Sequence, residues 1–242
     1  MTLAPTLDPE PSSAPSASPV QADRQPPVRS VALPPLPRQG VVLSDEHGVR
    51  FVGLDGDEIA LLRHFELAYG WIVPGPVLFK QHRTWFLLRV GAHQLRPLPS
   101  REAAARIGLQ FQAGVDPMSD TYLGLPLPRS RTDRSGFWAY ALPSPDGSML
   151  LEQWSGECEA PVAFLAGPGG ADPRPVTGSW GLRHAGESRG LGWTTDGRAV
   201  VDVFDSPCGD AFDRPGVYLV DGPGDGTLLL ATRDGARMWG TA

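Results

Sequence analysis

One short segment carries a pattern typical of a nucleophilic serine. Residues 186–190 read Gly-Glu-Ser-Arg-Gly, which matches the G-x-S-x-G motif of enzymes of the α/β-hydrolase class. In those enzymes a strand, a tight turn and a helix present the serine to a base. Here a β-type run with Trp193 and an Asp-Gly turn follow, so the required helix is missing. We therefore interpret Ser188 as a loop serine between repeats and predict no catalytic residue.

The two cysteines, Cys158 and Cys208, lie fifty residues apart, each just past an apolar run. Equivalent points on neighbouring repeats usually lie farther apart than the roughly 7 Å that a disulfide tolerates. The surrounding loops, 155–161 and 205–215, are long enough to approach each other, so a disulfide and two separate loop thiols both stay open. A pairing would indicate an oxidising compartment. A reactive thiolate would need a base, and His184 is the closest histidine in sequence.

Acidic residues on glycine-rich loops could bind a metal, but here they fit turns better. Residues 221–226 read Asp-Gly-Pro-Gly-Asp-Gly and lack the distal glutamate of a calcium loop. The segment 55–58 has the same character, since Asp and Gly serve tight turns themselves. The five histidines show no ligand spacing. We predict no metal and no cofactor, and we interpret the nearest acid pair, Glu152 and Glu157, as solvated carboxylates.

A repeat with a period of fifty residues dominates the second half of the chain. Residues 144–151 (Ser-Pro-Asp-Gly-Ser-Met-Leu-Leu) return as residues 194–201 (Thr-Thr-Asp-Gly-Arg-Ala-Val-Val), and the register holds as far as the two cysteines. An Asp-Gly turn that leads into an apolar strand at such a period is typical of stacked β-sheets such as propeller blades. The repeat therefore predicts turns at Asp146-Gly147 and Asp196-Gly197.

The coarse pattern of short apolar runs predicts about four units of antiparallel strands. The clearest units are 136–178, with strands at 136–142, 149–155, 162–166 and 174–177, and 189–232, with strands at 189–193, 199–204, 216–220 and 227–232. Earlier runs lie at 49–54, 58–62, 70–73, 76–79, 84–90 and 94–98. Residues 234–239 begin another repeat, which pairs with 40–44 to close a ring or leaves an open edge.

These residues resemble TolB-like and WD40-like propeller repeats. The carriers are 144–151, 192–201 and the strand 216–221, and the likeness is good over 136–235 and loose over 40–100. The resemblance implies an all-β propeller-like array of about four four-stranded antiparallel blades. Familiar members of that class have more blades, so we expect a small or incomplete ring. A second chain could supply the remaining blades, which would make the protein an oligomer.

Composition divides the chain into an arm and one domain. Residues 1–38 hold ten of the 26 prolines and no apolar run, which predicts a disordered arm before a domain over 39–242. The net charge of −6, with twenty arginines and only Lys80, argues against nucleic-acid binding. We expect no membrane insertion and leave the compartment open: cytoplasmic as the sequence stands, extracytoplasmic if the cysteines pair or an upstream anchor is missing.

The seven tryptophans recur through the repeats and are expected to pack between blades, with Trp154 and Trp193 as candidates for a ligand-binding face. The leading functional hypothesis is a non-enzymatic binding or scaffolding module that presents blade loops to a protein or small ligand. One alternative is a propeller hydrolase or lyase with carboxylates or His184 in a central cleft. Another is the extracytoplasmic sensor domain of an anchored protein. Fold alone does not choose among them.

Overall fold

The chain folds into antiparallel β-sheets. A computed structural model describes residues 29–67, 77–89, 91–103, 121–122, 125–126, 136–155, 160–177, 187–205, 214–232 and 235–240. Within these ranges the helical parts are one turn at residues 101–103 and the 3-10 turn η1 (Pro168–Gly170). The expectation of an all-β array of blade-like sheets is confirmed.

The third and fourth sheets are the two units in which the repeat is clearest. The third has the order β11 (Gly136–Pro143), β12 (Met149–Ser155), β13 (Ala160–Gly167), β14 (Ala171–Pro175), and the fourth has β15 (Glu187–Trp193), β16 (Ala199–Phe204), β17 (Gly216–Gly222), β18 (Asp225–Ala231). Each strand pairs with its neighbours in sequence, as expected for antiparallel blades. Both units therefore match the strands that the sequence predicts.

The first sheet joins strands from opposite parts of the chain. Its order is β19 (Ala236–Trp239), β2 (Gly40–Asp45), β3 (Gly48–Gly53), β4 (Glu58–Leu62). In the antiparallel pair of β19 and β2, Trp239 stands opposite Gly40. A Cβ on Gly40 would lie 2.2 Å from the Trp239 ring, so this position requires glycine. Of the two expectations for the last repeat, pairing with residues 40–44 is confirmed.

The second sheet has five strands and extends into the predicted arm. Its order is β1 (Val31–Ala32), β8 (Gln94–Pro97), β7 (Thr84–Leu88), β6 (Val77–Gln81), β5 (Glu66–Leu67). β1 pairs with β8, and Leu33 beside it is buried, so these residues belong to the folded domain and not to a disordered arm. The run 70–73 and residues 1–28 lie outside the described residues. A small two-stranded sheet consists of β9 (Thr121–Tyr122) and β10 (Leu125–Pro126).

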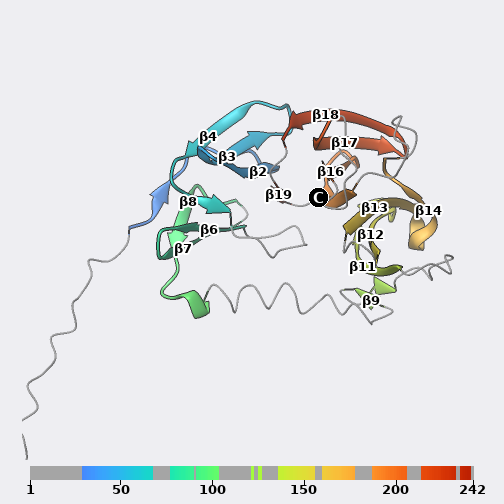
Figure 1. Cartoon of the computed structure of the whole chain (residues 1–242), viewed down its shortest axis with the longest axis horizontal. Helices are drawn as coiled ribbons and strands as arrows, with labels where there is room; N and C mark the ends of the chain where they lie inside the picture. Colours follow the sequence, from blue (N-terminus) through green and yellow to red (C-terminus); the bar gives the residue numbers. More distant parts are fainter. Residues whose placement is uncertain are drawn as a thin grey trace, which may run out of the picture.

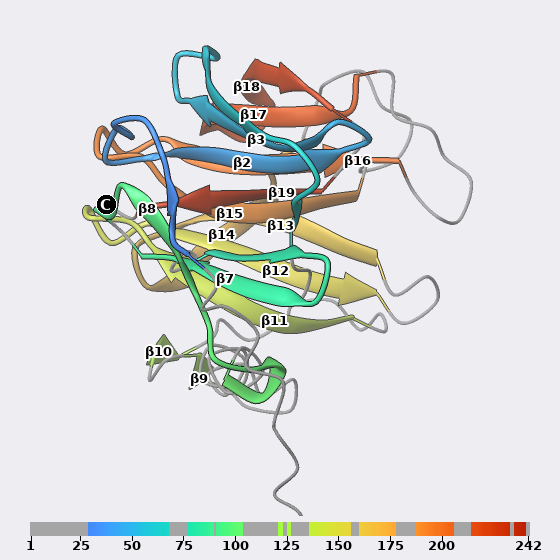
Figure 2. The same ribbon diagram turned by 90° about the vertical axis from the view of Figure 1, so that its left-hand side faces the viewer.

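The four large sheets follow one another in the order second, first, fourth, third, as Figures 1 and 2 show. Apolar clusters fill the three interfaces between neighbours in this row. Alternate residues of β16 face opposite ways, because side chains alternate along a strand. Val201 and Val203 pack toward the third sheet, and Val200 packs toward the first. Among the described residues no helix is long and apolar enough to cross a membrane.

Two of these interfaces matter below. Each is named after the side chain of the fourth sheet that accepts a backbone N–H across it, a hydroxyl at one interface and a carboxylate at the other. The neutral seam joins the third and fourth sheets, and its cluster includes Leu151, Trp193 and Val201. The charged seam joins the fourth and first sheets, and its cluster includes Val200 and Met238.

Candidate functional site

The predicted Asp-Gly turns have the same conformation in the third and fourth sheets. In each, the glycine lies in the left-handed region, with φ 87° at Gly147 and 88° at Gly197. The Gly147 N–H donates to the Ser144 carbonyl over 3.1 Å, and the Gly197 N–H donates to the Thr194 carbonyl over 3.0 Å. This is a three-residue hairpin loop in which glycine supplies the positive φ. The turn interpretation of both Asp-Gly pairs is confirmed.

The aspartates of these turns are bound by their own loops. Both carboxylates accept a hydrogen bond from a hydroxyl, Ser144 for Asp146 and Thr194 for Asp196. The hydroxyl of Ser144, followed by the Ser148 N–H, lowers the pKa of Asp146. The hydroxyl of Thr194, followed by the Arg198 side chain at 3.0 Å, lowers the pKa of Asp196. Both aspartates therefore stay ionised as turn residues.

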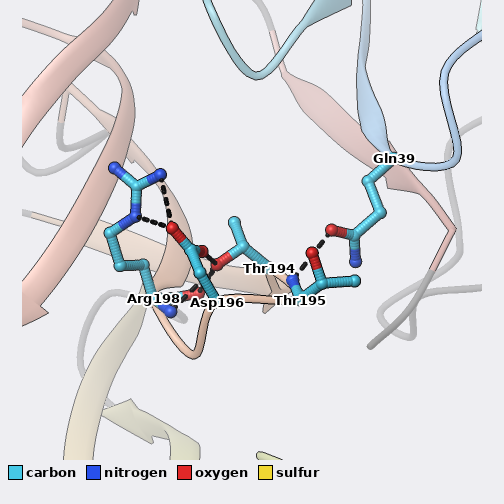
Figure 3. A network of polar contacts seen from close by, with 5 residues as sticks. All are labelled: Gln39, Thr194, Thr195, Asp196 and Arg198. Carbon is cyan, nitrogen blue, oxygen red and sulfur yellow. Dashed lines mark hydrogen bonds and ion pairs between the residues drawn. The ribbon is translucent and has the colours of Figure 1, made fainter.

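A side chain from before the first sheet holds the turn of the fourth sheet, as Figure 3 shows. The buried Gln39 accepts a hydrogen bond from the Thr195 N–H over 2.9 Å. Its amide also donates to the Trp193 carbonyl over 3.0 Å. These two bonds occupy both ends of the amide, so Gln39 ties the 194–198 turn to the chain that enters β2.

Trp193 connects the third and fourth sheets and is also bonded to the segment that precedes the first sheet. It is only 7% exposed and packs in the neutral seam. Its indole N–H donates to the Leu142 carbonyl of the third sheet over 2.8 Å, while its own carbonyl accepts from Gln39. The expectation that tryptophans pack between blades is met here, and the buried N–H has the partner that it needs.

A groove of about 470 Å³ opens over the neutral seam, at the end of the sheets where these turns lie. Trp193 and Gly197 line it, together with four exposed charged residues: Asp146, Asp172, Asp221 and Arg174. Arg174 pairs with Asp172 at 3.0 Å. Because three carboxylates face one guanidinium, the lining carries a net negative charge. The sequence-predicted Asp146, Gly197 and Trp193 therefore come together at one groove.

The loop that contains Asp221 spans the same seam. Its Gly224 N–H donates to the Val176 carbonyl of the third sheet over 3.0 Å. The loop connects β17 and β18, with Gly222 opposite Asp225. The segment 221–226 is thus a turn, as the sequence predicts, and it forms one wall of the groove.

A second groove, of about 700 Å³, lies between the first and second sheets. Two of its acidic residues form ion pairs, Asp45 with Arg50 at 2.7 Å and Glu66 with Lys80 at 3.5 Å, and Glu46 lies 3.7 Å from the His47 ring. Neither the predicted turn residues nor Trp193 lines it, although it includes His47 and His64. We therefore take the groove over the neutral seam as the candidate site.

Ser188 is not a loop serine, which corrects the interpretation from sequence. It lies in β15 and is fully buried, and its Oγ accepts a hydrogen bond from the Ala163 N–H of the third sheet over 2.9 Å. The run that follows Gly186 is a strand where the hydrolase motif needs a turn and a helix. The Ser188 hydroxyl joins two sheets across the neutral seam.

The sequence analysis did not single out Asp202, which is a buried acid in the structure. It lies in the middle of β16, is 2% exposed, and accepts a hydrogen bond from the Ala236 N–H over 3.1 Å. Glu152, fifty residues earlier in β12, is also fully buried and is not the solvated carboxylate that we expected. The missed signal was an acid that recurs inside an otherwise apolar strand.

Several candidates lie outside the described residues: Cys158, Cys208, His184, Glu157 and the side chain of Trp154, whose backbone belongs to β12. Their pairing and roles stay predictions. Within the described part of the chain no three residues of the types His, Cys, Asp and Glu come together as a metal site would require.

The chain was compared with known proteins. No protein-family model matches it, and no curated protein or solved structure shows significant similarity to it. The resemblance to TolB-like and WD40-like repeats therefore stays a prediction.

Proposed function

We propose that the protein is a non-enzymatic binding module that holds a protein segment or a small ligand in the groove over the neutral seam. The observation that carries the proposal is the composition of this groove. Trp193 and turns from two sheets line a concave surface with exposed charged groups. Such a combination of apolar wall and convergent polar groups is typical of ligand sites.

The charge of the lining indicates which ligands the groove prefers. Asp146 and Asp221 add negative charge that Arg174, already paired with Asp172, does not balance. A ligand with an ammonium or guanidinium group is attracted by this excess, and one with a carboxylate is repelled. Ser188, the serine of the G-x-S-x-G motif, is bonded to Ala163 at the neutral seam and does not line the groove. This supports a binding role over hydrolysis.

Two capped tripeptides that differ only in a central Lys or Glu test the proposal on the ¹⁵N-labelled full chain. We expect the Lys peptide to shift the amide signals of Gly197 and Asp221, and the Glu peptide to leave them unchanged. Asp221→Asn should weaken Lys-peptide binding by about two- to fivefold, as expected for one exposed charge. Asp57→Asn, at an exposed turn of the first sheet, is the matched control and should change nothing. Unchanged lining signals with both peptides would contradict the proposal.

A further inference from the structure

The carboxylate of Asp202 is buried at the charged seam, where it reaches a strand of another sheet. The flanking Val200 and the opposite Val217 both belong to the apolar cluster of this seam. The acceptor oxygen of Asp202 receives the Ala236 N–H of β19 over 3.1 Å. On its other side β19 pairs with β2, so this amide belongs to the free edge of the strand. One carboxylate thus attaches the C-terminal strand to the fourth sheet.

The charged groups that face Asp202 come from two strands. Arg189 stands opposite Asp202 on β15, and Arg237 follows Ala236 on β19. Glu187 lies two residues before Arg189 on the same side of β15 and is 5% exposed. The described parts of β17 and β2 that pack here present apolar side chains, such as Val217 and Leu43.

Burial affects the pKa of Asp202 more than its hydrogen-bond donor and the nearby arginines do. It raises the pKa of Asp202 to about 6, although the Ala236 N–H and the two arginines act in the opposite direction. The ordinary pKa of the carboxyl is 3.8, so the folded chain binds this proton more tightly than the unfolded chain does. The resulting stability is fully present below about pH 4 and is lost as the pH rises through about 6.

We propose that Asp202 is an ionisable latch, through which the attachment of β19 to the fourth sheet strengthens on mild acidification and weakens toward neutral pH. The contact survives protonation because the carbonyl oxygen of a carboxylic acid still accepts the Ala236 N–H. Only the buried negative charge disappears. The neutral seam has a contact of the same kind, Ser188 with Ala163, whose acceptor does not titrate.

The first test is an NMR titration of the ¹³C- and ¹⁵N-labelled full chain. We expect the Asp202 carboxyl carbon to titrate near pH 6 and the Ala236 amide to shift with the same midpoint. The Ala163 amide at the neutral seam should not follow this titration. A carboxyl midpoint near 4, or an Ala236 amide that does not follow it, would overturn the proposal.

The second test compares unfolding in urea from pH 4 to pH 7 for wild type and Asp202→Asn, so that all other titrations cancel. The two pKa values predict that the unfolding constant of wild type rises about 50-fold relative to the variant over this range. Ser188→Ala, the matched control, should show a constant ratio to wild type. Equal pH profiles for wild type and Asp202→Asn would refute the latch. If the variant does not fold, the titration of the wild type decides alone.

Discussion

The neutral and charged seams each join the fourth sheet to a neighbouring sheet through one side-chain acceptor, but the acceptor is a hydroxyl at one seam and a carboxylate at the other. At both, a side-chain oxygen of the fourth sheet accepts a backbone N–H from the neighbouring sheet. Ser188 accepts from Ala163 over 2.9 Å at the neutral seam, and Asp202 accepts from Ala236 over 3.1 Å at the charged seam. A hydroxyl costs little to bury once it is bonded, whereas a carboxylate carries a desolvation penalty of several kcal/mol.

This difference suggests that the two faces of the fourth sheet have different roles, one beneath the groove and one at the attachment of β19. The neutral seam forms the floor beneath the groove, where Trp193 connects the third and fourth sheets. The charged seam attaches β19, the strand that completes the first sheet. We expect the groove to keep its shape over the pH range in which the attachment of β19 changes.

The largest expected effect is at the neutral seam, on Trp193→Ala. The variant loses a buried indole and leaves the Leu142 carbonyl without its donor, so we expect a loss of about 3–5 kcal/mol in the free energy of unfolding. Urea unfolding at pH 7 measures it. Trp193→Phe, which keeps most of the ring, should cost less. Equal losses for the two variants would show that the hydrogen bond, and not the packing, holds this seam.

A smaller effect is expected for Ser188→Ala, which removes one acceptor from the same seam. The Ala163 N–H is then buried without its partner, which costs about 1–3 kcal/mol. Ser44→Ala on β2, where the described residues show no side-chain hydrogen bond, is the control and should stay within about 0.5 kcal/mol of wild type. A wild-type unfolding midpoint for Ser188→Ala would remove the basis for comparing the two seams.

The local pattern of the sequence was sufficient to predict the strands of the third and fourth sheets. Residues 144–151 and 194–201 carry both the turn and the apolar strand after it, so each unit is visible without its neighbours. The pairing of 236–239 with 40–44 was one of two expectations, because the last repeat has only one strand and needs partners from elsewhere. Asp146, Gly197 and Trp193 were identified through the same repeat.

The seams themselves could not be predicted, because they depend on which strand of one sheet faces which strand of the next. Ser188 looks like a loop residue only as long as β15 is thought to begin at residue 189, two residues after its actual start. Gln39 contacts Thr195, which is 156 positions away in sequence, and no local sequence pattern predicts such a contact. Asp202 is a polar residue in an apolar strand, and only the approach of β19 explains it.

The smallest expected loss of stability is at the glycines of the two Asp-Gly turns. It tests whether the turn of the fourth sheet responds to substitution as the turn of the third does. Ala at Gly147 or Gly197 meets no close neighbour, but it must adopt a φ near 88°, which costs about 1–2 kcal/mol. Gly222→Ala is the control, since this residue has open space and no positive φ, and it should be neutral or slightly stabilising. Thermal unfolding of the three variants measures the differences.

Equal losses at the two glycines would mean that each turn acts alone, as its matching hydrogen bonds indicate. Among the described residues, Gln39, just before β2, bonds to the 194–198 turn, and no such bond is shown for the 144–148 turn. A clearly larger loss for Gly197→Ala would therefore mean that strain in the turn reaches those bonds. In that case the groove and the attachment of the first sheet would be mechanically connected, and the separation of the two seams would not hold.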